Sequence, residues 1–419
     1  MTRARGANAK LRLKFETEYG VAPSGNYANV PFVSLTLGEQ QGLVASDLLG
    51  QGRHPQAPAL DVVDNDGQAV VPVDVRNFGY WLKLAMGAPA SDTQGAAAAG
   101  SIAFSAQPAT AATITLGATD VEFDDDVDLG ATLPDTLTAL AEFLNASADT
   151  DISKCVYALD TDRKTLLVTY KTLGAGGNSF ALAASSSPAS HATVSASTLA
   201  GGGTTGNYNH VFVPGGANPS ASLEVGLTDV SEFDMNAGVK VSTLEIALQR
   251  SGNLNATIGL IAQSETSHGS TQAGTPTDLE VIRFAQGSGQ VLRDGVPIGN
   301  LVSGNLKFDN GLDKVEVIRR DGRIAGADEG IMAVTGSLVV RYDPGNPVPP
   351  AGTPVDIQFS WVHEAFRLTL DLHEVFLPKP QKPITGPGGV QATYNWQAAE
   401  NKALSKTLTA TLVNDVASY

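Results

Sequence analysis

Short segments in which apolar and polar residues alternate recur along most of this 419-residue chain, for example at residues 33–37 and 71–75. A period of two is typical of β-strands with one buried face. The triplet Asn65-Asp66-Gly67, which precedes the second segment, predicts a hairpin turn. Charged residues make up only 17% of the chain and aromatic residues 6%, which disfavours a protein built from long helices. We therefore predict a mainly β protein.

Two segments carry a helical pattern instead. Residues 78–86 could form a short helix or a strand that ends at Gly87-Ala-Pro89, and we favour the helix because Phe78, Trp81, Leu82 and Ala85 would share one of its faces. Residues 134–146 have leucines at the same helical spacing, which predicts an amphipathic helix.

The composition changes between residues 97 and 202. Small residues flank this stretch at 94–100 and 201–206, and such segments suit the flexible joints of an inserted domain. The stretch has twelve acidic and four basic residues, a net charge of −8, which is half the net charge of the whole chain. Strand patterns at 155–159 and 165–170 add a hairpin to the predicted helix. We predict a small acidic α+β module here.

The β segments on either side of this module look like two copies of one unit. The motif Gly252-Asn-Leu-Asn-Ala-Thr257 is echoed by Gly389-Val-Gln-Ala-Thr393. The series Leu35-Thr-Leu37, Gly42-Leu43 and Gly52-Arg53 resembles Leu306-Lys-Phe308, Gly311-Leu312 and Gly322-Arg323. An internal repeat of this kind predicts two related β modules in tandem, the first interrupted by the insertion.

These patterns divide the chain into five parts. We predict a basic N-terminal arm at 1–20, a first β module at 21–96 plus 203–264, the acidic insertion at 97–202, a linker at 265–278 and a second β module at 279–419. The arm is expected either to be loosely ordered or to dock onto a neighbouring copy.

Charge and composition exclude several classes of function. The net charge of −16 repels phosphates, so a tight grip on nucleic acid is not expected. No apolar run is long enough to insert into a membrane, and the start of the sequence lacks the apolar region of a secretory signal. The single cysteine, Cys155, excludes a disulfide framework, and we expect it to be a buried small hydrophobe and not a nucleophile.

The search for chemistry identifies no catalytic residue, cofactor site or metal site. His363-Glu364 and His373-Glu374 lie on apparently consecutive strands and could face each other around a metal, but polar cross-strand pairs are far commoner. The acidic run Asp124-Asp-Asp-Val-Asp128 offers oxygen ligands for a hard cation, yet it lacks the fixed spacing of a calcium loop. A solvated loop is the expectation, and cation binding stays open. We predict that the chain is not an enzyme.

Several segments together resemble a known family. They are residues 30–50, the stretch from Phe78 through Gly87-Ala-Pro89, residues 222–226, residues 376–389, Tyr394-Asn-Trp-Gln-Ala398 and residues 412–416. In these segments the chain resembles the tail tube (major tail) proteins of long-tailed bacteriophages. The insertion is similar to small modules that recur in phage tail proteins, through Ala131-Thr-Leu133, Ala139-Leu140 and Gly177-Asn-Ser-Phe180.

The resemblance implies β-sandwich or barrel modules whose strands join between copies into a barrel around a channel. It implies rings stacked into a tube that surrounds the tape-measure protein and later lets DNA pass without binding it tightly. Tail-tip and terminator proteins would be further partners. Single-module relatives form hexameric rings, so a double module implies a trimeric, pseudo-hexameric ring, with a hexamer as the alternative. The protein would belong to the virion and be assembled in the host cytoplasm, with the insertion projecting outward.

A secreted adhesin or surface-layer protein is the alternative interpretation, because such proteins share the Gly/Thr-rich β composition and acidic character. The missing secretory signal weighs against it.

Overall fold

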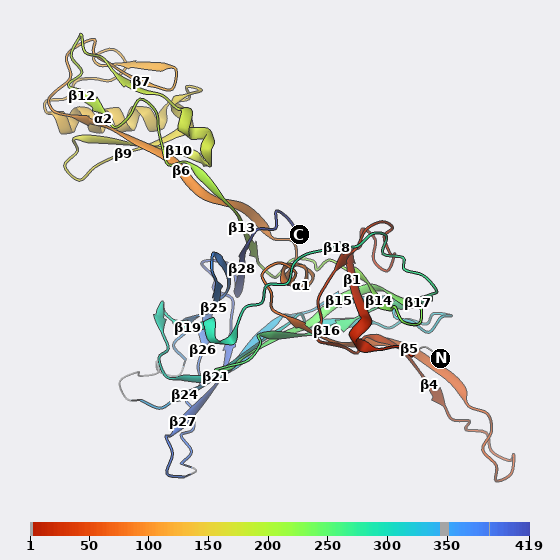
Figure 1. Cartoon of the computed structure of the whole chain (residues 1–419). Coiled ribbons are helices and arrows are strands. Elements are labelled where there is room, and N and C mark those ends of the chain that lie inside the picture. The colour runs from red at the N-terminus through yellow and green to blue at the C-terminus, as the bar shows by residue number, and fades with distance from the viewer. Residues whose placement is uncertain (1–2, 344–351, 385) are drawn as a thin grey trace. The chain divides into compact units, whose positions relative to one another are not determined.

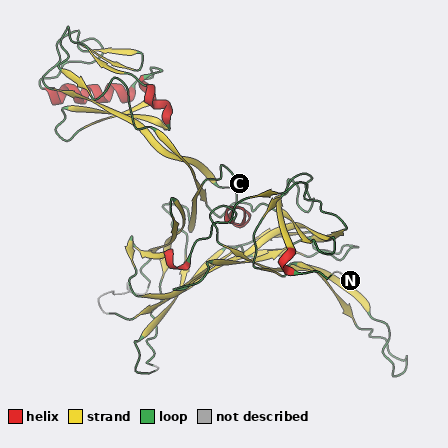
Figure 2. Ribbon diagram, viewed as in Figure 1, coloured by secondary structure: helices red, strands yellow, loops and turns green. Residues whose placement is uncertain are grey.

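The computed structural model describes residues 3–343, 352–384 and 386–419. It is mainly β, with two α-helices among the described residues (Figure 2). The chain forms two compact units, one made of Met1–Ser91 and Asn209–Tyr419 and the other of Asp92–Tyr208. The predicted insertion lies within the second unit.

The second unit combines one helix with short strands. Helix α2 (Leu133–Ala146) begins with a capping box between Thr132 and Asp135, and its leucines Leu137, Leu140 and Leu144 are buried, so the predicted amphipathic helix is confirmed. The strands are β6 (Ala90–Phe104), β7 (Thr113–Leu116), β8 (Thr119–Glu122), β9 (Cys155–Leu159), β10 (Thr165–Leu173), β11 (Leu182–Ala184), β12 (Ala192–Val194) and β13 (Gly203–Phe212). The predicted hairpin is formed by β9 and β10.

The small-residue segments at 94–100 and 201–206 correct the expectation of flexible joints, since most of their residues lie inside β6 and β13. These two strands pair with each other. A Cβ atom on Gly95 would lie 2.4 Å from the carbonyl oxygen of Gly203, so the small residues allow two backbones to approach closely.

The first unit contains two series of strands. The first series is β1 (Ala9–Phe15), β2 (Ala28–Asn29), β3 (Ser34–Leu35), β4 (Gly38–Val44), β5 (Ala59–Pro72), β14 (Ala221–Leu227), β15 (Glu232–Leu248), β16 (Asn255–Ile261), β17 (Ser264–His268) and β18 (Thr277–Asp278). The second is β19 (Gly289–Arg293), β20 (Val296–Pro297), β21 (Leu301–Asp309), β22 (Leu312–Val315), β23 (Gly326–Glu329), β24 (Ala333–Arg341), β25 (Val355–His363), β26 (Phe366–Phe376), β27 (Gln391–Ala398) and β28 (Leu408–Asn414).

The two series pair in the same way. In the first, β1 pairs with β14, β14 with β15, and β15 with both β16 and β17, while β16 also pairs with β5. In the second, β19 pairs with β25, β25 with β26, and β26 with both β27 and β28, while β27 also pairs with β24. The first unit is therefore an internal duplication at the level of strand pairing.

The register of the duplication is constant over a long stretch. Ser34 pairs with Val70 as Ser303 pairs with Val339, and Val44 pairs with Ala59 as Asp313 pairs with Asp328. Each of the four residues Ser34, Val44, Ala59 and Val70 precedes its counterpart in the second copy by the same number of residues. This register makes Leu37 the counterpart of Leu306, so the sequence alignment that set Leu37 against Phe308 is out of register. A second constant offset holds at β16 and β27, where Ala256 and Ala392 correspond.

Gly67 and Gly336 illustrate the equivalence. A Cβ atom on Gly67 would lie 2.6 Å from the carbonyl oxygen of Thr36, and one on Gly336 would lie 2.1 Å from that of Asn305. Thr36 and Asn305 are counterparts, and each accepts a hydrogen bond through its side chain from the backbone of the opposite strand. The predicted turn at Asn65-Asp66-Gly67 is wrong: β5 runs straight through it, and Gly67 serves the close approach of two strands.

The predicted N-terminal arm is also an integral strand. Residues 9–15 form β1, which pairs with β14 of the same chain, and Leu11 and Leu13 are buried in the core. The Arg12 guanidinium lies 2.5 Å from the carboxylate of Glu224, which is fully buried, so the basic residue of the arm neutralises a core acid. This intrachain docking corrects the expectation of a loose or exchanged arm.

The segment 265–278, expected to be a linker, contains most of β17 and the short β18. β15 has 17 residues, and β16 pairs only with its second half. β17 pairs with the first half, from Ala237 opposite Ser264 to Phe233 opposite His268. The polar segment is thus needed to complete the pairing of a long strand.

One junction joins the two copies. The second half of β15 pairs with β16 on one edge and with β21 on the other, from Thr243 opposite Asp309 to Leu248 opposite Gly304. This makes one sheet in which β4, β5, β16, β15, β21, β24 and β27 are neighbours. Helix α1 (Phe78–Met86), predicted from its apolar face, packs into the same core.

Candidate assembly surface

The histidines considered for a metal site are not brought together. His363 pairs with Phe366 at the hairpin end of β25 and β26, whereas Nε2 of His373 lies 2.8 Å from the Thr409 hydroxyl near the other end of β26. Within the described ranges, no group of three or more His, Cys, Asp or Glu side chains is placed to hold a metal ion.

The acidic run after β8 is a turn held by its own backbone. Phe123 and Val127 form a bridge and are buried, while the Asp126 carboxylate accepts a hydrogen bond of 2.9 Å from the backbone N–H of Glu122. Asp124 and Asp125 are exposed to solvent. This is the geometry of a solvated loop anchored by two apolar side chains.

Cys155 is buried, as expected, and burial raises the pKa of its thiol to about 11. A thiol that stays protonated at neutral pH is a poor nucleophile.

The features that do stand out are two equivalent hairpins. The outer part of the hairpin formed by β4 and β5, residues 43–60, is here called the first arm, and it extends away from the rest of the sheet (Figure 1). Its counterpart in the second repeat is the hairpin of β22 and β23, residues 312–329, here called the second arm. The two arms have the same length.

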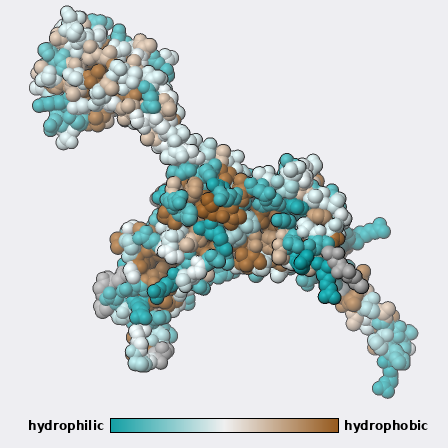
Figure 3. Space-filling view, viewed as in Figure 1, coloured by the Kyte–Doolittle hydropathy of each residue, from teal (hydrophilic) through white to brown (hydrophobic). Residues whose placement is uncertain are grey.

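Both arms carry an exposed apolar pair at the same position. Leu48 and Leu49 of the first arm are 66% and 92% exposed, and their counterparts Val317 and Ile318 are half and fully exposed. Exposed large apolar side chains at corresponding places in both repeats point to a contact surface. On the face drawn in Figure 3, the larger apolar patches lie over the first unit.

The second arm docks onto the first repeat of its own chain. The backbone N–H of Val63 donates a 3.0 Å hydrogen bond to the carbonyl oxygen of Gly322. Ile324 and Ala327 bury their side chains with Ile261 of β16. The Gln263 side-chain amide donates to the carbonyl oxygen of Ala325 at 3.0 Å.

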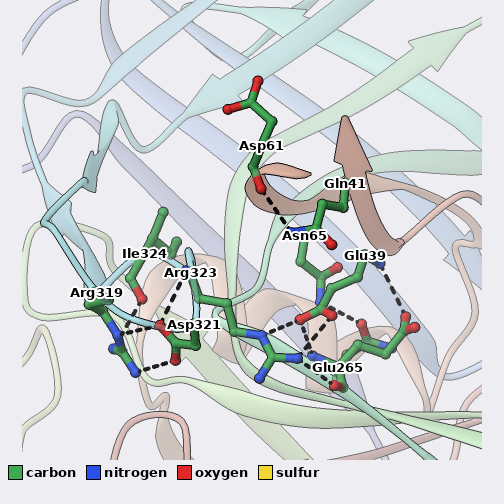
Figure 4. A network of polar contacts seen from close by, with 10 residues as sticks. Glu39, Gln41, Asp61, Asn65, Glu265, Arg319, Asp321, Arg323 and Ile324 are labelled. Carbon is green, nitrogen blue, oxygen red and sulfur yellow. Dashed lines mark hydrogen bonds and ion pairs between the residues drawn. The ribbon is translucent and has the colours of Figure 1, made fainter. Parts of the chain in front are cut away.

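Ion pairs reinforce this docking (Figure 4). The Arg323 guanidinium binds the Glu39 carboxylate with two bonds of 2.6 and 2.9 Å, and it also donates to the carbonyl oxygen of Glu265. These bonds to Glu39 raise the pKa of Arg323, while burial raises the pKa of the Glu265 carboxyl. A two-bonded guanidinium–carboxylate pair fixes orientation as well as charge.

Lysines hold both flanks of the second arm. The Lys314 ammonium lies 2.8 Å from the Asp66 carboxylate and 3.2 Å from that of Asp64. On the other flank, the Lys240 ammonium lies 2.7 Å from Glu329.

An open groove lies beside β24 and β27 of the second repeat. Ile331, at its rim, is almost fully exposed. The residues that line the open groove are residues 213–216, Ile331, Met332, Val334, residues 398–400 and residues 405–407.

The sequence already contained part of this surface. Leu43 and Leu312 of the first repeated motif, and the motif Gly52-Arg53 with Gly322-Arg323, fall in the two arms. The constant register sets Arg53 against Gly322, so the sequence alignment of the second motif is out of register by one residue. The exposed apolar pairs were missed, although two adjacent large apolar residues at the same distance from Gly42 and Gly311 were a readable signal.

Comparison with known proteins identifies the family of the chain. No helix in the described part of the chain has both the length and the apolar character needed to cross a bilayer. The chain matches no curated protein. The family model described as phage tail tube protein matches residues 6–398, nearly the whole sequence. The chain therefore belongs to the phage tail tube protein family, whose members are structural components of the virion that assemble into the tail tube.

Proposed function

We propose that three copies of this chain close into one ring of pseudo-sixfold symmetry and that the rings stack into a tail tube. The observation that carries the proposal is the duplicated strand pairing, with its two copies joined side by side through β15 and β21. Repeating the same junction between chains would continue the sheet around a closed cylinder, which leaves no lateral sheet edge exposed. Two modules per chain would fill a six-module ring with three chains.

Stacking needs a second contact, of a different kind. A head-to-tail contact that does not close on itself produces an open-ended filament. The exposed apolar pairs Leu48-Leu49 and Val317-Ile318 supply six similar contacts in a three-chain ring. We assign them to the contact between successive rings, where burial of apolar surface would stabilise the stack.

The channel of such a tube would surround the tape-measure protein before ejection and then conduct DNA. The net charge of −16 supports passage without tight binding, because like charges repel the phosphate backbone. Tail-tip and terminator proteins would cap the two ends. This structural role does not call for an enzymatic activity.

The acidic unit at residues 92–208 would project from the outside of the tube, where it could block neither the channel nor the stacking faces. It has a hydrophobic core of its own, which supports a separate folding unit. A chain lacking residues 97–202 should therefore still assemble, and loss of polymerisation in that variant would count against the outward position.

Electron microscopy of the concentrated protein, combined with mass measurement of isolated rings, tests the proposal. We expect tubes of uniform width with a central bore and three chains per ring. Flat lattices or monomers would reject the tube and favour a surface-layer protein, and six chains per ring would reject the pseudo-sixfold arrangement.

A further inference from the structure

The two arms have unequal surroundings, although they are counterparts in the duplication. The second arm docks onto the first repeat through Val63, Ile261, Gln263 and Glu39. The first arm extends into solvent, with Leu43, Leu48, Leu49 and Leu60 each more than 60% exposed. Because the two arms are counterparts, we expect the first arm to have a docking site like that of the second arm. Within the described residues the first arm makes no such contact where it lies, so its docking site must be at another place.

The constant register identifies that site. The offset that relates Ser34 to Ser303 makes Ile331 and Met332 the counterparts of Val62 and Val63. The offset that relates Ala256 to Ala392 makes Ala399 the counterpart of Gln263. Ile331, Met332 and Ala399 all line the open groove. The open groove is thus the second repeat's version of the surface on which the second arm already docks.

We propose that the first arm of one chain docks into the open groove of a second copy, in the way that the second arm docks within its own chain. This inference rests on the proposed ring, and it assigns the lateral contact between neighbouring subunits. The intrachain bond from Val63 N–H to the Gly322 carbonyl has as its counterpart a bond from Met332 N–H to the Arg53 carbonyl of the neighbour.

The chemistry of the two surfaces matches. The first arm offers Leu43, the counterpart of Leu312, which packs at the docking site of the second arm, together with Arg53 and His54. The open groove offers the almost fully exposed Ile331, with the carboxylate of Glu400 and the ammonium of Lys406 in its lining. The second arm docks with a basic side chain, Arg323, on the Glu39 carboxylate, and in the constant register the counterpart of Arg323 in the first arm is His54.

The occupant must be a second copy and not the arm's own chain. The first arm extends from β4 and β5 on the side of the first unit away from β24 and β27, which lie on the opposite side in Figure 1. The first arm and the open groove therefore cannot meet within one chain, although their counterparts, the second arm and its docking site, do meet. A contact of this kind can repeat from subunit to subunit around a ring.

Cysteine cross-linking tests this contact. A Cβ atom at Gly322 would lie 3.8 Å from Cγ2 of Val63, so side chains at the two positions are neighbours, and a cysteine at Gly322 requires the backbone there, with its φ of +68°, to accept a side chain. The matched control is therefore Val63→Cys with Gly322→Cys, which should cross-link within one chain. The test variant is Arg53→Cys with Met332→Cys, its counterpart between chains. Cys155 can remain, because it is buried.

We expect oxidised tubes of the test variant to give two- and three-chain species on non-reducing gels, with three chains as the upper limit, while the control stays at one chain. If tubes form and the control cross-links but residues 53 and 332 remain free thiols, the docking proposal is wrong and the tube proposal stands. A ladder beyond three chains would place the arm on the next ring, which also overturns lateral docking. Failure of the wild-type chain to form tubes would reject the proposed function itself.

Hydrogen exchange of the wild-type protein gives an answer that depends on no variant. Assembly should slow exchange at least tenfold both in residues 43–60 and around Met332. Unchanged exchange around Met332 in assembled tubes would overturn the proposal.

Discussion

The ring of Tyr419 occupies the space that a side chain at Gly79 would need, because a Cβ atom on Gly79 would lie 2.1 Å from Cζ of Tyr419. Gly79 lies in α1, and the Lys83 ammonium in the same helix donates a 2.8 Å hydrogen bond to the Tyr419 carbonyl oxygen. The Tyr419 ring also packs edge-on against Tyr80 at 5.3 Å. The last residues of the sequence therefore hold α1 against the core.

Gly79→Ala should destabilise the first unit by about 1–3 kcal/mol, because the added methyl group overpacks this contact. A loss of stability would identify the steric contact as the cause, since alanine is otherwise favoured over glycine inside a helix by about 1 kcal/mol. Chemical denaturation measures the difference. Gly6→Ala is the control, since no heavy atom lies within 4 Å of a Cβ there. In a Tyr419→Ala background the cost of Gly79→Ala should largely disappear, and an unchanged cost would contradict the steric explanation.

Acidification should destabilise the protein partly through His210. Burial lowers the pKa of this histidine from its usual 6.5, and the neutral ring lies 2.7 Å from the Ser91 hydroxyl and 2.8 Å from the Val416 carbonyl oxygen. Below about pH 6.5 the unfolded chain binds a proton that the folded chain does not. The free energy of unfolding therefore decreases as the pH is lowered. His210→Gln should lose less stability between pH 7.5 and pH 5.5 than the wild type does. Equal losses of stability in the wild type and in His210→Gln would show that His210 does not contribute to the acid sensitivity.

A charge at the exposed apolar pairs should stop stacking without preventing ring formation. Leu49→Asp combined with Ile318→Asp places a carboxylate at both positions, and burying an unpaired charge between rings costs several kcal/mol. We expect isolated rings by electron microscopy and a sharp loss of tube length. Val281→Asp, at a half-exposed valine outside both arms, is the matched control. Long tubes from the double variant would assign the pairs to some other contact.

Cys155 should resist alkylation in the folded protein. Its side chain is buried, and the pKa raised to about 11 leaves little thiolate at pH 7.5. Iodoacetamide labelling followed by mass spectrometry should be at least a hundredfold slower than in denaturant. Rapid labelling under native conditions would mean that the second unit opens readily.

The sequence was sufficient for the parts governed by local pattern. The helices at 78–86 and 133–146 follow from their apolar faces, and the hairpin of β9 and β10 follows from two strands with a turn between them. The duplication was also visible, because glycines such as Gly42 and Gly311 recur at corresponding positions of the two copies.

What could not be predicted depends on contacts distant in the sequence. Asp66-Gly67 has ideal turn chemistry, yet the approach of Thr36 makes Gly67 a strand residue. The N-terminal segment with Leu11 and Leu13 forms a strand because it pairs with β14, which follows the whole insertion in the sequence. The open groove is formed by three segments that are far apart in the sequence, and no local pattern marks it.

The insertion interrupts only the first copy, between α1 and β14, whereas in the second copy β25 begins at Val355, soon after β24 ends at Arg341. A tube built from such chains would carry its acidic appendages on alternate modules, a third of a turn apart in each layer. The bare modules between them would leave lanes along the outer wall, so any molecule that binds the outside of the tail would meet a threefold pattern of charge on a nearly sixfold scaffold.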